Sequence, residues 1–377
     1  MASSEEEEPQ SQIIIPEPWV LAADAIAYDS ITSPPPVILI CGAKNSGKTT
    51  FSRYLVNVLI QRYKKVAYLD TDVGQSEFTP PGCLSLTVID KLTPDLAIPC
   101  LKSPLRCYYF GDTSSKRDPK AYLDSVYALY DYYRQEYCTS STSNSVGKLE
   151  LPLVINTPGW VKGIGYEMLV EMLKYISPSH VVKINISTER KNLPAGAFWL
   201  NEDDLENLIL IELNSALQDS SIKLIPVQKN SKLLRDLKLM AYFRQCFQSD
   251  RNITTIKELA HALAAHPPFE VPISRVKIRH LHCEVPTTVL YHSLNASIVG
   301  LAVDSKDSGN LPCTVGLGII RGIDTLRQVL YIITPVPQST LEDVDLLLQG
   351  FIQIPTCLLQ IGGCMAPYMI ANALPFN

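Results

Sequence analysis

Residues 37–50 read Val37-Ile38-Leu39-Ile40-Cys41-Gly42-Ala43-Lys44-Asn45-Ser46-Gly47-Lys48-Thr49-Thr50. An apolar run enters the pattern Gly-x-x-x-x-Gly-Lys-Thr, and apolar residues at helical spacing follow it up to Arg62. A strand, a glycine-rich loop and a helix in this order form a P-loop, in which backbone N–H groups at the helix N-terminus bind phosphate oxygens. The stretch therefore predicts a binding site for ATP or GTP.

Each type of P-loop residue has a defined role in such a site. Gly42 and Gly47 allow backbone dihedrals that a Cβ atom would forbid, so successive N–H groups can point at the phosphates. Lys48 supplies positive charge for the β- and γ-phosphates, and the Thr49 hydroxyl supplies a ligand for Mg²⁺. The nucleotide-binding residues that we predict are Gly42, Ala43, Lys44, Asn45, Ser46, Gly47, Lys48, Thr49 and Thr50.

The composition is that of an ordinary globular protein, with 377 residues, 46% hydrophobic and 19% charged, and a formal net charge of −5. This charge argues against a chain coated with basic residues for nucleic acid, while leaving room for a local basic patch. No run approaches the roughly 18 apolar residues of a membrane span. The acidic Glu5-Glu6-Glu7-Glu8 has the wrong sign for a secretory leader. We therefore expect no membrane association and a location in the cytoplasm or nucleus.

A second group of functional residues follows the buried strand Val66-Ala67-Tyr68-Leu69-Asp70, whose polar exit reads Asp70-Thr71-Asp72-Val73-Gly74-Gln75. Ligands of open α/β sheets bind at the carboxyl ends of strands, so we expect Asp70 and Asp72 beside the P-loop. Phosphoryl transfer needs a carboxylate near the metal ion and one that receives a hydroxyl proton. This acid pair could meet both needs.

The length predicts a large α/β domain and a smaller second one. Residues 1–36 are acidic and then proline-rich, and we expect an arm in which Trp19-Val20-Leu21 lies extended on the main domain. Residues 37–266 are expected to form a P-loop domain with a mostly parallel sheet, whose last strand is 222–227. Residues 267–377 are expected to form a smaller antiparallel β-rich domain; its candidate strands include 274–278, 287–291 and 356–360.

The most basic window of the chain surrounds a helix expected at about 231–247, with Ser231 as its N-cap. Between Lys223 and Arg251 the sequence has seven basic residues and two acidic ones. A solvated helix face explains this pattern, and a lid that contacts phosphate is the functional alternative. In the second interpretation, Arg235 and Lys238 would neutralise charge on the transferring phosphoryl group.

A kinase and three alternatives to it are compatible with the P-loop and the acid pair. A kinase would use an acceptor hydroxyl, and an NTPase would use water. A GTPase switch is suggested by Asn156-Thr157-Pro158-Gly159, but Asn stands where that class has Asp, and the guanine-reading Asn-Lys-x-Asp motif is absent from the sequence. A catalytically silent nucleotide-binding scaffold is the third alternative, and the presence of Lys48, Thr49 and both carboxylates counts against it.

Four motifs together resemble the eukaryotic polynucleotide 5′-hydroxyl kinases. They are Gly42 to Thr49, the run from Asp70 to Gly82, Gly111-Asp112-Thr113-Ser114 and Asn156-Thr157-Pro158-Gly159-Trp160. The likeness is closer to the nucleolar branch that acts in pre-ribosomal RNA processing than to the mRNA cleavage-factor branch. It implies transfer of the γ-phosphate of ATP, with Mg²⁺, to the 5′-hydroxyl of an RNA end. It also implies a nucleolar location and an endoribonuclease partner that creates this end.

The resemblance also implies roles for individual residues. Asp72 matches the acid that binds Mg²⁺ with Thr49, and Asp70 and Asp72 together would activate the hydroxyl. Arg235 matches a lid arginine, and Lys238 occupies the second lid position, where it lacks the bidentate fork of an arginine. The residues matched to RNA binding are Thr157, Gly159, Trp160 and Gln75, together with Lys238. For Trp160, a core tryptophan beside a strand end is the alternative.

Overall fold

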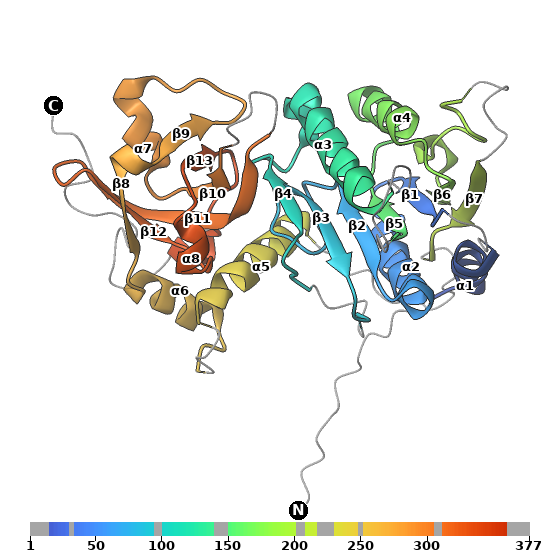
Figure 1. The fold of residues 1–377 in the computed structure, drawn as a ribbon, viewed down its shortest axis with the longest axis horizontal. Helices are drawn as coiled ribbons and strands as arrows, with labels where there is room; N and C mark the ends of the chain where they lie inside the picture. Colours follow the sequence, from blue (N-terminus) through green and yellow to red (C-terminus); the bar gives the residue numbers. More distant parts are fainter. Residues whose placement is uncertain are drawn as a thin grey trace, which may run out of the picture.

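The computed structural model describes residues 15–29, 34–93, 100–138, 150–200, 208–216, 230–247, 252–304 and 311–359. Within these ranges the chain forms two β-sheets that lie side by side, with helix α5 (Ser231–Arg244) running between them (Figure 1).

The first sheet is the mainly parallel sheet expected around a P-loop. Its spatial order is β4-β3-β2-β5-β1-β6-β7. Its strands are β1 (Val37–Gly42), β2 (Val66–Asp70), β3 (Cys83–Ile89), β4 (Arg106–Tyr109), β5 (Leu153–Asn156), β6 (His180–Asn185) and β7 (Ile209–Asn214). β3 pairs antiparallel with both of its neighbours, β2 and β4, and the other described strand pairs of this sheet are parallel. Because Asn156 on β5 is in register with both Asp70 on β2 and Ile40 on β1, the polar carboxyl ends of these three strands meet at one edge.

Helices cover both faces of this sheet. α2 (Lys48–Tyr63) begins at the P-loop and packs with α1 (Glu17–Asp24) in one apolar cluster, which includes Trp19, Ile40 and Phe51. α3 (Pro119–Tyr137) and α4 (Gly163–Ile176) pack on the opposite face, in the cluster that includes Leu39 and Leu69. The alternation of strand side chains between the two faces explains why neighbouring residues of β1 enter different clusters.

The second sheet has the order β8-β12-β11-β10-β13-β9. Its strands are β8 (Phe269–Pro272), β9 (Lys277–His280), β10 (Ile298–Val303), β11 (Cys313–Asp324), β12 (Val329–Ile333) and β13 (Leu346–Gln349). α5 and α6 (Ile256–Ala265) pack on it, and a single apolar cluster joins Phe243 of α5, Tyr109 of β4 and Ile319 of β11. The two sheets therefore share part of their core.

Several expectations for the β-rich part were wrong. Residues 287–291 form a 3-10 turn (Thr287–Val289) and the start of α7 (Leu290–Leu294), and α9 (Thr356–Leu359) replaces the strand expected at 356–360. The expected strand at 274–278 is in part a 3-10 turn (Ile273–Arg275) that precedes β9. The sheet is not purely antiparallel either, because β9 and β13 pair parallel.

The N-terminal residues also differ from expectation. Glu17–Asp24 is a helix rather than an extended segment, and Trp19 is 1% exposed. The N-cap of α5 is Asn230, whose side chain accepts a hydrogen bond from the Lys232 amide, and not Ser231. The strand expected at 222–227 lies outside the described residues, where nothing tests it.

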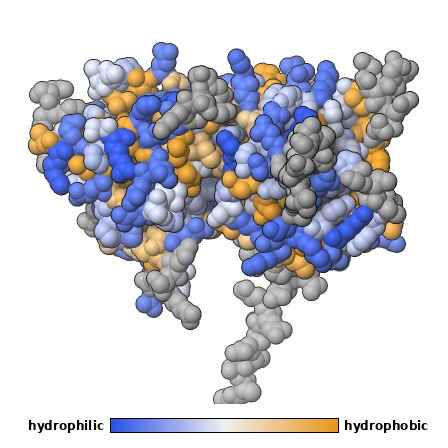
Figure 2. Space-filling model, viewed as in Figure 1, coloured by the Kyte–Doolittle hydropathy of each residue, from blue (hydrophilic) through white to orange (hydrophobic). Residues whose placement is uncertain are grey.

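Among the described helices none is both long and apolar enough to span a membrane. Figure 2 shows that hydrophilic and hydrophobic residues are mixed over the visible face.

Candidate active site

The P-loop has the backbone geometry that phosphate binding requires. Gly42 has φ 142° and Gly47 has φ 99°, and a Cβ atom on Gly42 would lie 2.3 Å from the carbonyl oxygen of Ile184. Gly47 is also the N-cap of α2, so the N-terminus of this helix points its free N–H groups into the loop. The sequence Gly42 to Lys48 thus leaves no room for a side chain at Gly42 and creates an anion site at the helix end.

Lys48 lies inside this loop. Its Nζ donates hydrogen bonds to the carbonyl oxygens of Gly42 at 3.1 Å and Ala43 at 2.8 Å. Burial lowers the pKa of Lys48 to about 8, while the negative charge of Asp72 acts in the opposite direction. The lysine is therefore held in the loop by backbone carbonyl groups, and its pKa is affected by the charge of Asp72, which follows β2.

The two carboxylates of this exit differ in exposure. Asp70 is fully buried, and its Oδ1 accepts hydrogen bonds from the Asp72 amide and from Asn156 Nδ2, each at 3.2 Å. Its Oδ2 accepts one from the Glu77 amide. Burial raises the pKa of Asp70 to about 7, and the hydrogen bond from Glu77 lowers it. Asp70 thus holds the turn that follows β2, with no surface facing solvent.

Asp72 is partly exposed at the same edge. Its Oδ1 accepts hydrogen bonds from the amides of Gly74 at 3.0 Å and Gln75 at 2.9 Å, whereas Oδ2 accepts none from the described residues. One oxygen therefore fixes the carboxylate, and the other remains for a ligand. Of the predicted acid pair, Asp72 is the member whose position suits contact with a metal ion or substrate.

The motif after β5 lies against the P-loop. A Cβ atom on Gly159 would be 2.6 Å from both the backbone N and Cα of Lys44, so this glycine permits close contact between the two loops. The Thr157 side chain is buried, and its hydroxyl donates to the carbonyl oxygen of Ile40 at 2.8 Å. Trp160 is 9% exposed and packs edge-on against Tyr122, with 5.2 Å between ring centroids. In this structure both side chains face the protein interior, as the alternative of a core tryptophan predicts.

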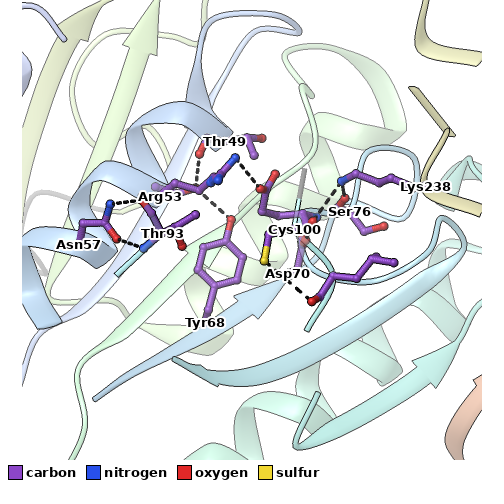
Figure 3. Close-up of polar contacts among 12 residues, drawn as sticks. Thr49, Arg53, Asn57, Tyr68, Asp70, Ser76, Thr93, Cys100 and Lys238 are labelled. Atoms are coloured by element: carbon purple, nitrogen blue, oxygen red, sulfur yellow. Dashed lines mark hydrogen bonds and ion pairs between the residues drawn. The ribbon is translucent and has the colours of Figure 1, made fainter. Parts of the chain in front are cut away.

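Residues 70–77 form the acid turn that follows β2, and α5 is tied to it at two points. Lys238 Nζ donates to the carbonyl oxygens of Ser76 and, at 3.1 Å, Glu77, and Gln75 Nε2 donates to the Ser231 carbonyl at 3.3 Å. Figure 3 shows Lys238 pointing at the turn that carries Ser76. Arg235 is half-buried on the same helix and forms no ion pair or hydrogen bond with the described residues. The structure thus brings Gln75 and Lys238 together with the acid pair, and leaves Arg235 without a partner there.

Sequence reasoning missed two charged residues of this region. Arg53 and Glu77 form an ion pair with Nη1 and Oε1 3.1 Å apart, and their side chains are 4% and 8% exposed. Glu77 lies within the motif that starts at Asp70, so its position in the sequence could have indicated a place in the site. Arg53 gave none, because a single arginine in an amphipathic helix normally faces solvent.

Comparison with known proteins places these motifs in a family. Residues 42–245 match the model of the mRNA cleavage and polyadenylation factor CLP1 P-loop, and residues 264–355 match that of the NOL9-like C-terminal domain. The polynucleotide 5′-hydroxyl-kinase NOL9 of Arabidopsis thaliana is 59% identical over 362 residues, which cover 96% of both chains. This protein belongs to the NOL9 family of polynucleotide 5′-hydroxyl kinases. The Danio rerio and Homo sapiens members of the same name are 33% and 32% identical.

The NOL9 family members differ in length. The chain spans 96% of the Arabidopsis relative but 47% and 50% of the Danio rerio and human ones. Among solved structures, the wild-type Clp1p–Pcf11p (454–563) complex contains a similar chain, with a TM-score of 0.59 and 16% identity over 88% of this chain and 77% of that one. This likeness supports the Clp1-like P-loop fold, in agreement with the match of residues 42–245 to the CLP1 P-loop model.

Proposed function

We propose that this protein is an ATP-dependent kinase that transfers the γ-phosphate to the 5′-hydroxyl group of RNA. Membership of the NOL9 family supports a kinase, and the site supports the two-substrate chemistry. The observation that carries the proposal is that Lys48 in the P-loop lies near enough to Asp72, in the turn after β2, for the negative charge of Asp72 to raise the pKa of Lys48. A donor phosphate bound by Lys48 would lie beside the carboxylate of Asp72.

The residues present fit a magnesium ion. The Thr49 hydroxyl at the start of α2 and Asp72 Oδ2 are oxygen ligands of the kind that Mg²⁺ prefers. The described residues contain no group of three or more His, Cys, Asp or Glu that could hold a metal. This agrees with Mg²⁺, which takes most of its ligands from water and substrate phosphates. When bound, the ion would neutralise charge on the phosphoryl group.

The chain's own residues would perform the remaining tasks. Lys48 would move from the carbonyls of Gly42 and Ala43 to the β- and γ-phosphates, because phosphate oxygens are better acceptors for its charge. Asp72 would accept the proton of the attacking hydroxyl or orient it, while Asp70 holds the turn. Arg235, with no partner among the described residues, would approach the transferring group from α5.

The RNA-binding roles of Gly159, Thr157 and Trp160 are also part of the proposal, with a refinement. Since the side chains of Thr157 and Trp160 are buried, RNA phosphate would contact the backbone of this motif rather than the hydroxyl or indole. We further propose a nucleolar location, an endoribonuclease partner that supplies 5′-hydroxyl RNA, and a domain division into residues 37–266 and 267–377.

A labelling assay tests the function. The protein is incubated with Mg²⁺, γ-labelled ATP and 5′-hydroxyl RNA or DNA of one sequence, beside the variants Lys48→Ala and Asp72→Asn. We expect label on RNA with the wild type and little or none with either variant. Free labelled phosphate without labelled RNA would indicate an NTPase. Nucleotide binding without either product, even with an endoribonuclease present, would indicate a silent scaffold.

A further inference from the structure

The Arg53–Glu77 ion pair is buried, yet it has no part in the chemistry described so far. Removing two charges from water costs several kcal/mol per ion, and well-packed apolar residues often replace such a pair without loss of stability. Stability alone therefore gives a weak reason for an arginine and a glutamate at these positions. The contacts of Glu77 supply a stronger reason.

Glu77 contacts three different parts of the candidate active site. Its carboxylate pairs with Arg53, which lies on α2 one turn after the P-loop residue Thr49. Its backbone N–H donates to Asp70, and its backbone carbonyl accepts from Lys238 on α5. Figure 3 shows Arg53 on one side of the turn that carries Ser76 and Lys238 on the other.

We propose that Glu77 and Arg53 are positioning residues that fix the acid turn and α5 relative to the P-loop helix. The inference rests on the proposed kinase function and extends it to residues outside the substrate site. Arg53 on α2 holds the Glu77 carboxylate and thereby fixes the peptide group between Ser76 and Glu77. This peptide group in turn orients Asp70 and Lys238. The position of Asp72 is then fixed as well, because its backbone amide donates a hydrogen bond to Asp70 Oδ1 at 3.2 Å.

The charges around Glu77 agree with this role. Burial raises the pKa of Glu77, and the positive charges of Lys238 and Arg53 lower it. Both cations come from elements that flank the turn, α5 and α2, so each is attracted to the same carboxylate. A neutral side chain at position 77 would keep its volume but lose the attraction from both sides.

The test compares Glu77→Gln with the double variant Arg53→Met/Glu77→Met in the full chain. Glu77→Gln leaves Arg53 buried beside a neutral group, so we expect lower thermal stability as well as lower activity. The double variant removes both charges and should recover stability. If the pair positions the site, kcat of both variants falls on the order of 10²-fold, as small displacements of catalytic groups can cause. The KM for ATP should change little, because neither residue belongs to the P-loop.

Glu171→Gln is the matched control, since Glu171 forms an exposed ion pair with Lys174 on α4, with side chains 57% and 55% exposed. We expect wild-type kcat from it. Recovery of both stability and kcat in the double variant would show that the pair is only structural and would overturn the proposal. Wild-type kcat in Glu77→Gln would do the same.

A second measurement does not depend on catalysis. Amide hydrogen exchange of α5 should be faster in the double variant than in the wild type, because Lys238 loses its fixed carbonyl partners. Unchanged exchange in α5 would contradict the positioning role even if the wild type labels no RNA. If exchange changes as expected and the wild type labels no RNA, the proposed function fails while the positioning role stands.

Discussion

Trp19 provides the sharpest test of how the N-terminal helix supports the P-loop. Its ring is 1% exposed and contacts Phe51 edge-on, with 5.4 Å between centroids. A Cβ atom on Gly47 would lie 2.7 Å from Trp19 Cη2, so the ring lies directly beneath the loop. Trp19 Nε1 also donates to the Asn214 carbonyl, at the end of β7, at 2.8 Å. One side chain thus connects α1, the P-loop helix and the edge strand β7.

Replacing Trp19 by alanine should destabilise the protein strongly. Removal of a buried tryptophan costs about 3–5 kcal/mol through lost burial and the cavity left behind. Loss of the hydrogen bond adds about 1 kcal/mol and leaves the Asn214 carbonyl with one partner fewer. A loss of roughly 4–6 kcal/mol corresponds to a fall in Tm of roughly 10–20 °C for a domain of this size.

Leu21→Ala is the control, because Leu21 lies on the same helix but is 62% exposed. Its effect should stay within about 0.5 kcal/mol. Thermal unfolding followed by circular dichroism measures both variants, and nucleotide affinity below the transition shows whether the P-loop has lost its support. Equal melting temperatures for Trp19→Ala and Leu21→Ala would refute the reasoning, and the N-terminal segment would then be an arm without a structural role.

Three further predictions concern the site itself. Gly159→Ala places a Cβ atom 2.6 Å from the Lys44 backbone, which must shift, so we expect weaker ATP binding and a lower Tm; unchanged affinity in a fluorescence titration would contradict this contact. Lys48→Met tests the burial that lowers the pKa of Lys48 to about 8. The folded state releases the proton before the unfolded state does, so wild-type stability relative to the variant should rise by about 2 kcal/mol between pH 7.5 and 9.5 in urea unfolding; a flat difference would show that the lysine is not buried. Lys238→Met removes the contact of α5 with Ser76 and Glu77, and we expect faster proteolytic cleavage near α5 and a lower kcat, whereas wild-type behaviour in both assays would exclude a role for this contact.

The P-loop and the acid turn were predictable because their information is local. Gly42, Gly47 and Lys48 lie in one continuous motif, and the rule that ligands bind at strand ends placed Asp70 and Asp72 beside them. Their different exposure could not be read from the sequence. It arises because Asn156 and the Glu77 amide, which come from other positions in the chain, surround Asp70 and not Asp72.

The wrong secondary-structure predictions have identifiable causes. The acidic and proline-rich composition of residues 1–36 favoured an extended arm. Proline is nevertheless well tolerated at the start of a helix, and in α1 Pro16 is the N-cap and Pro18 lies in the first turn. Thr287–Val289 has β-branched residues typical of strands, yet it follows Pro286, and the Val289 amide bonds back to the Pro286 carbonyl at 3.0 Å. In both cases a local turn outweighed the propensity of the composition.

The position of Arg53 shows a different limit of sequence reasoning. Its partner Glu77 follows β2 in the sequence, 24 residues after Arg53, and only the fold brings the two side chains together. Helical periodicity assigns an arginine to the solvent face by default, so a buried ion pair is visible only once both elements have been placed. The same holds for Trp19, whose neighbours on α2 and β7 are distant in sequence.

The central claim is that the site transfers phosphate to a terminal hydroxyl of RNA. The most direct test uses two RNA oligonucleotides of identical sequence, one with a 5′-hydroxyl and one with a 5′-phosphate, each incubated with the protein, Mg²⁺ and γ-labelled ATP. We predict that only the 5′-hydroxyl RNA becomes labelled and that a phosphatase acting on 5′ ends removes all of the label. Equal labelling of both RNAs, or label that the phosphatase leaves in place, would contradict the account.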